Sequence, residues 1–148
     1  MPKYKAPTPT ANYHWHETEN GVAITLTLPL PSRHVSPNAR RGQSRSAAIA
    51  KSRHVKLHRQ RARIITRAAL STGPAPTVTG YTLAFHWPTK AYRDDDNADA
   101  SCKSYRDGIA DALGIDDRSL RKIALSTHHL DRDRPRLEIT IHTTANEP

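Results

Sequence analysis

Hydrophobic and polar residues alternate along several parts of the chain, and this pattern predicts β-strands. Over residues 22–30 the apolar side chains occupy every second position, until Pro29 and Pro31 end the strand by removing backbone donors. The same alternation runs over residues 81–87 and 136–143, and a further strand is expected over residues 123–129. The charged segment 131–135 is expected to join the last two strands as a hairpin loop.

Two other segments space their apolar residues as an amphipathic helix does. Residues 46–70 contain neither glycine nor proline, which indicates a long helix, and residues 98–113 indicate a second helix that Gly114 ends. The residues expected to face the core are Ala50, Leu57, Ile64, Ile65 and Ala68 in the first helix and Ala98, Cys102, Tyr105, Ile109 and Ala112 in the second.

The order of these elements predicts an α+β domain, in which two main helices pack on a small mixed or antiparallel sheet. Residues 1–20 show no apolar periodicity and carry three prolines, so we expect a flexible N-terminal arm that docks Trp15 on the surface. The folded domain is expected to span residues 21–148.

The charge of the chain indicates the kind of partner that it binds. The 148 residues carry a formal net charge of +9, and no Asp or Glu occurs between Glu19 and Asp94. The basic residues of the first helix therefore have no acidic neighbour on that helix to pair with, and DNA phosphates would supply the missing counter-charge. The residues expected to contact the DNA backbone are Arg33, Arg40, Arg41, Arg45, Lys51, Arg53, Lys56 and Arg59.

Other features bear on location. Cys102 is the only cysteine, which rules out an internal disulfide and fits a reducing compartment. No apolar run approaches the ~18 residues of a membrane span, and the N-terminus lacks the apolar core of a signal peptide. We therefore expect a cytoplasmic protein with no membrane partner.

Acidic residues gather abruptly before the second predicted helix. Asp94, Asp95, Asp96 and Asp99 crowd together there, and an Asp116–Asp117 pair follows that helix. Like charges this close favour a bound cation, and oxygen ligands suit a hard divalent ion. Carboxylates that hold Mg²⁺, together with a lysine, are what metal-assisted phosphodiester hydrolysis needs. The same aspartates also suit helix capping and turns, and composition alone does not separate the two interpretations.

The order of motifs resembles the RusA family of Holliday-junction resolvases. The matching segments are residues 28–32 (Leu-Pro-Leu-Pro-Ser), 93–97 (Arg-Asp-Asp-Asp-Asn), 107–113 (Asp-Gly-Ile-Ala-Asp-Ala-Leu), 115–117 (Ile-Asp-Asp) and 136–140 (Arg-Leu-Glu-Ile-Thr). The Asp-x-Asp-Asn signature followed by an Asp-Asp pair is the most specific part. The resemblance covers about four-fifths of the chain and leaves out the N-terminal arm.

This resemblance implies a homodimeric, RusA-like endonuclease of a bacterial or phage-infected cell that cuts four-way DNA junctions with Mg²⁺, or Mn²⁺ as an alternative. It implies that Asp94, Asp96 and Asp117 hold the metal and that Lys103 completes the catalytic set. One departure concerns the position of the lysine. In this chain Lys103 follows Asp96 by seven residues, whereas in the founding members of the family the lysine follows the second aspartate by four. Asp99 has the four-residue spacing to Lys103 and is an alternative carboxylate.

Two other functions compete with the nuclease. A non-catalytic basic DNA-binding protein of recombination or replication would keep the fold without binding metal, although a pure binding site would gain from losing its aspartates. A basic RNA-binding protein would need exposed aromatic residues for base stacking. Aromatic residues make up only 5% of this chain, and most fall on predicted core faces.

Overall fold

The computed structural model describes residues 12–19, 21–37, 44–73, 77–91 and 93–144. Five strands form one sheet, and helices follow the second and third strands. The strands are β1 (Tyr13–Thr18), β2 (Gly21–Leu28), β3 (Thr77–Trp87), β4 (Thr127–Leu130) and β5 (Arg136–Thr144). The helices are α1 (Arg45–Leu70), α2 (Asp95–Ala100) and α3 (Lys103–Leu113), with short 3₁₀ turns η1 (Arg33–Val35) and η2 (Asp117–Ser119).

The sheet is mixed, with strand order β1-β2-β5-β3-β4. β5 lies between β2 and β3 and runs antiparallel to both, whereas β4 pairs in parallel with β3. This confirms the α+β class and the mixed sheet with two main helices. The predicted hairpin between the last two strands is wrong, because β3 lies between β4 and β5. The segment 131–135 therefore crosses over the end of β3 instead of forming a tight turn.

The N-terminal arm needs a correction where the structure describes it. Residues 13–18 form β1, an edge strand that pairs antiparallel with β2, and residues 1–11 lie outside the described residues. Trp15 does dock, because its indole Nε1 donates a hydrogen bond to the carbonyl of Ala69 over 3.1 Å. The alternation of Tyr13 and Trp15 with polar neighbours was too short to signal a strand, and the pairing with β2 supplies the missing backbone partners.

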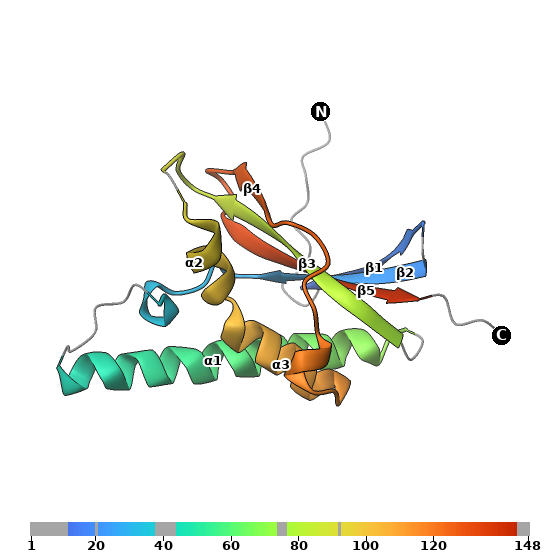
Figure 1. Cartoon of the computed structure of the whole chain (residues 1–148), viewed down its shortest axis with the longest axis horizontal. Coiled ribbons are helices and arrows are strands. Elements are labelled where there is room, and N and C mark those ends of the chain that lie inside the picture. The colour runs from blue at the N-terminus through green and yellow to red at the C-terminus, as the bar shows by residue number, and fades with distance from the viewer. Residues whose placement is uncertain (1–11, 20, 38–43, 74–76, 92, 145–148) are drawn as a thin grey trace.

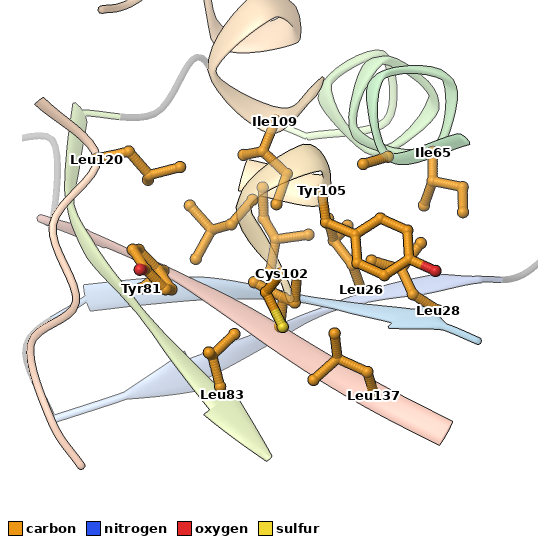
Figure 2. Close-up of a cluster of buried hydrophobic side chains, with 14 of the residues drawn as sticks. Leu26, Leu28, Ile65, Tyr81, Leu83, Cys102, Tyr105, Ile109, Leu120 and Leu137 are labelled. Carbon is orange, nitrogen blue, oxygen red and sulfur yellow. The ribbon is translucent and has the colours of Figure 1, made fainter. Parts of the chain in front are cut away.

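The helices α1 and α3 cover one face of the sheet, and the hydrophobic core lies between them and the strands (Figure 1). Cys102, Tyr105 and Ile109 meet Leu26, Leu83 and Leu137 of the strands there, as Figure 2 shows. Gly108 of α3 lies against the backbone of α1, because a Cβ at this position would overlap the carbonyl oxygen of Arg59. A small residue is therefore required where the two helices touch.

The core-facing stripe of α1 differs from the predicted one. Ile65 is buried as expected, but Leu57 is 51% and Ile64 57% exposed. The buried face instead carries small or polar residues, which are His58, Ala62, Thr66 and Ala69 alongside Ile65. Because α3 packs closely against α1, the buried face of α1 has small side chains. A prediction based on large apolar residues therefore assigned the wrong face of α1 to the core.

The predicted second helix is two helices. α2 begins at Asp95, earlier than expected, and Cys102 lies between α2 and α3 with φ −88° and ψ 0°. The break leaves the core face intact, because Ala98, Cys102, Tyr105 and Ile109 are all buried. Gly114 ends α3 in the left-handed conformation with φ 68°, as predicted. No helix in the described ranges is long and apolar enough to cross a membrane.

Candidate functional site

Three consecutive aspartates open α2, which lies beside the C-terminal ends of β3 and β4 (Figure 1). Asp94 is the N-cap, and its Oδ1 accepts a hydrogen bond of 3.2 Å from the backbone N–H of Asn97. Asp95 and Asp96 occupy the first turn, where the positive end of the helix dipole stabilises negative charge. All three side chains are exposed. The backbone thus favours an acidic cluster here before any ligand binds.

The carboxylate of Asp95 is bound by another side chain of the protein. Its Oδ1 pairs with Nε2 of His128 on β4, and Nδ1 of that ring lies 2.9 Å from the indole Nε1 of Trp87. An indole N–H can only donate, so Nδ1 of His128 is the acceptor and Nε2 carries the proton given to Asp95. Both ring nitrogens are therefore engaged, and His128 holds α2 against the sheet instead of acting as a base.

The carboxylate of Asp99 is also bound by side chains of the protein. Nζ of Lys122 forms an ion pair with its Oδ2, and Oγ of Ser126 donates a hydrogen bond of 2.6 Å to its Oδ1. Both partners come from the segment between η2 and β4. The negative charge of Asp99 is offset by Lys122, which makes Asp99 a weak substitute for a metal-binding carboxylate. Asp94 and Asp96, in contrast, form no ion pair with any described residue.

A second acidic group surrounds a depression of about 370 Å³ along the exposed face of α3. Lys103 forms an ion pair of 3.0 Å with Asp107 there. Asp116 caps η2, and the hydrogen bond of 2.9 Å that its Oδ1 accepts from the backbone N–H of Arg118 holds the pKa of Asp116 below its usual value. The lining residues are Arg59, Lys103, Asp107, Ala110, Asp111, Ile115, Asp116 and Asp117.

The structure therefore brings together two of the four predicted catalytic residues. Lys103 and Asp117 line the same depression, whereas Asp94 and Asp96 lie at the opposite end of the α2–α3 segment and do not line it. Nowhere in the described ranges are three or more His, Cys, Asp or Glu side chains placed to hold one metal ion. The break at Cys102 places Lys103 at the start of α3, where its Nζ pairs with Asp107, and its predicted service to the Asp94 side of the helix stays a prediction.

The predicted DNA-contacting residues fall into three groups. Arg40 and Arg41 lie outside the described residues. Arg59 is paired with Asp111 of α3 through two hydrogen bonds, from Nε over 2.7 Å and from the terminal NH2 nitrogen over 2.9 Å. This pairing raises the pKa of Arg59 and lowers that of Asp111. The third group is exposed and forms no ion pair with any described carboxylate, and its members are Arg33, Arg45, Lys51, Arg53 and Lys56.

Three residues that sequence reasoning did not assign contribute to this region. Lys122, Ser126 and His128 reach α2 from beyond η2, at sequence separations of 23, 27 and 33 residues from their partners. No spacing rule links a side chain to a partner that far away, so the sequence carried no signal for them. Arg93 is a fourth, because it lies beside Trp87 at the entrance to α2.

Comparison with known proteins identifies a similar protein whose function is not described. No protein-family model matches the chain. An uncharacterized protein of Xylella fastidiosa (strain Temecula1) is 46% identical over 90 residues, which cover 59% of this chain and 56% of that relative. The match thus spans a little more than half of the relative's length, and its name assigns no activity.

Proposed function

We propose that the chain is a Mg²⁺-dependent endodeoxyribonuclease that cuts four-way DNA junctions, similar to the RusA family. The observation that carries the proposal is that some aspartates at α2 are paired with basic side chains and others are not. Asp95 and Asp99 are held by His128 and Lys122, whereas Asp94 and Asp96 are exposed and pair with no cation among the described residues. In a chain of net charge +9, such carboxylates suit a cation from solution.

The donor chemistry of this region suits the proposed metal. Carboxylate oxygens on exposed side chains are the ligands that Mg²⁺ and Mn²⁺ prefer, and Mg²⁺ commonly binds through one or two of them. Asp94 and Asp96 would hold the ion, which supplies a more acidic bound water and neutralises phosphate charge. Lys103 places a cation beside Asp117, where it can stabilise charge on a phosphate oxygen. The basic face of α1 would bind the DNA backbone.

The separation of Asp117 from Asp94 and Asp96 gives the proposed homodimer a chemical role. A symmetric junction has two equivalent scissile phosphates, which a two-fold dimer can address together. In one chain Asp117 lines the depression along α3, and Asp94 and Asp96 do not line it. We propose a composite site, in which Asp94 and Asp96 of one copy and Asp117 of the second copy serve one phosphate.

The alternative is a basic DNA-binding protein without catalysis, and the same separation favours it if the chain acts as a monomer. A pure binding protein would use α1 in the same way but would leave Asp94 and Asp96 as helix caps. The two functions predict equal junction binding and differ only in cleavage.

The deciding experiment is cleavage of a labelled four-way junction at moderate salt, with Mg²⁺ or with EDTA. We expect paired nicks that need Mg²⁺ and that Asp96→Asn abolishes, while a linear duplex of the same sequence stays intact. Asp133→Asn is the matched control, because it removes one exposed carboxylate from the loop before β5. Tight binding without cutting in either Mg²⁺ or Mn²⁺ would leave the DNA-binding protein as the function.

A further inference from the structure

A cavity of about 400 Å³ lies between the end of β3, the strand β4 and the entrance to α2. This volume is near the lower end of the roughly 300–1,000 Å³ of small-molecule sites. Trp87, Lys90, Arg93, Asp95, His128 and Leu130 are among its lining residues. Because Asp95 lies between Asp94 and Asp96, the cavity is next to the carboxylates proposed to hold the metal.

An aromatic surface forms one side of the cavity. The Trp87 ring is nearly parallel to the rings of Phe85 and His128, with interplanar angles of 4° and 6°. The indole cannot rotate freely, because its Nε1 donates to His128, which in turn holds Asp95. A flat ligand that stacks here would meet a surface that is already ordered, so little conformational entropy is lost on binding.

The guanidinium of Arg93 covers one face of the Trp87 ring and presents its own outer plane. Its guanidinium carbon lies 4.4 Å from the centroid of the Trp87 ring, and its terminal NH2 nitrogen donates to Thr89 over 3.0 Å. Nε of Arg93 is buried and has no hydrogen-bond partner among the described residues.

The remaining lining residues define the class of ligand. Lys90 is exposed and adds a second positive charge, and Leu130 is 43% exposed and adds apolar surface. The one lining carboxylate, Asp95, is paired with His128. A flat ring system with hydrogen-bond acceptors and an attached anion matches this combination, and a nucleotide has all of these features.

We propose that this cavity binds one unpaired nucleobase of the DNA substrate, stacked on the outer face of the Arg93 guanidinium, whose other face packs on Trp87, with its phosphate toward Lys90. A base within a paired duplex cannot enter, so the cavity selects a strand that is opened next to the scissile phosphate. This inference rests on the proposed junction nuclease and names how that site distinguishes a branch point from a duplex.

The test uses Trp87 fluorescence in EDTA, so that it needs no cleavage. In a Trp15→Phe background Trp87 is the single tryptophan, and we expect quenching by a junction that carries an unpaired thymine at its branch point. The same junction with an abasic site should quench little and bind at least about fivefold more weakly, since base stacking on a planar side chain is strong. The control protein keeps Trp15 and carries Trp87→Phe, and its fluorescence should not respond.

One variant of Arg93 separates stacking from charge. Arg93→Lys keeps the charge and loses the plane, so it should bind abasic DNA normally and lose the preference for the unpaired base. Thermal unfolding of each variant identifies any loss of fold. Equal quenching by the unpaired base and the abasic site would overturn the cavity assignment even if the protein cuts junctions. Base-dependent quenching without cleavage in any metal would keep the cavity and refute the nuclease.

Discussion

The Nε2 atom of His128 donates a hydrogen bond to the carboxylate of Asp95 and so ties the edge strand β4 to the first turn of α2. The tautomer is determined by Trp87, whose indole N–H occupies the other ring nitrogen. This link positions the carboxylates on either side of Asp95 relative to the sheet. It also holds the Trp87 ring that the proposed base-binding cavity needs.

The first prediction concerns the stability of this link. His128→Ala removes the bond to Asp95 and leaves the Trp87 N–H unpaired, and we expect a loss of about 1 kcal/mol because Asp95 is well exposed. Urea unfolding measures the loss. His129→Ala is the control, since its exposed ring stacks on His86 and forms its hydrogen bond with Thr127 of the same strand, so it should cost less. Equal losses would show that the link to Asp95 contributes nothing.

The second prediction concerns pH and His58. Burial lowers the pKa of His58 to about 4 from 6.5, and Arg61 and His54 act in the same direction. Nε2 of the ring accepts a hydrogen bond of 3.0 Å from the backbone N–H of Ser32, which requires the neutral form. The unfolded chain takes up this proton near pH 6.5, so stability is full above that pH and falls as pH drops toward 4, by up to about 3 kcal/mol.

Chemical denaturation between pH 4 and 7.5 tests this for the wild type and for His58→Gln, whose amide oxygen can accept the same hydrogen bond. Burial also lowers the pKa of His86 and of His142, so the difference between the two proteins is the relevant quantity. We expect the variant to lose less stability than the wild type as pH falls. Parallel curves would show that His58 titrates normally in the folded protein.

The third prediction compares two basic residues of α1. Lys56 is exposed and forms no ion pair with the residues that the structure describes, whereas Arg59 is held by two hydrogen bonds from its guanidinium to Asp111. Lys56→Ala should therefore weaken duplex binding and reduce the slope of log affinity against log salt by about 1. Arg59→Ala should leave the slope nearly unchanged, because removing it also frees Asp111. A titration in 50–200 mM salt measures both, and equal slopes for the two variants would contradict the assignment.

The fourth prediction concerns the contact between α1 and α3. Gly108→Ala places a methyl group against the carbonyl of Arg59, so the helices must separate, and we expect a loss of about 2–3 kcal/mol. Gly114→Ala is the matched control, since no atom lies near its added Cβ but its φ of 68° disfavours any side chain, and it should cost about 1 kcal/mol. Thermal unfolding ranks the two, and the reverse order would show that the helices separate without cost.

The fifth prediction tests the composite site by mixing two inactive proteins. Asp96→Asn and Asp117→Asn should each abolish junction cleavage. If each site takes Asp117 from the other copy, a mixed dimer has one wild-type site, and an equal mixture should recover about a quarter of the wild-type nicks. These should be single nicks and not paired ones. No recovery in a mixture shown to exchange subunits would place all three aspartates of a site in one chain.

The sequence predicted those secondary-structure elements whose formation depends on residues close together in the chain. Alternation predicted β2, β3 and β5 because successive side chains of a strand face opposite sides. Gly114 predicted the end of α3 because a residue without a Cβ adopts positive φ readily. The acidic cluster before α2 was also visible, since aspartates at a helix start are favoured by the helix itself.

Only the tertiary structure decided which residues meet. β5 enters between β2 and β3, so its neighbours depend on long-range pairing that no turn motif encodes. The buried side of α1 depends on how closely α3 approaches, which selected Ala62 over Leu57. The roles of the aspartates were decided in the same way. Lys122 and His128 neutralise or hold two of them from distant segments, whereas within the described part of the fold no cation pairs with Asp94 or Asp96.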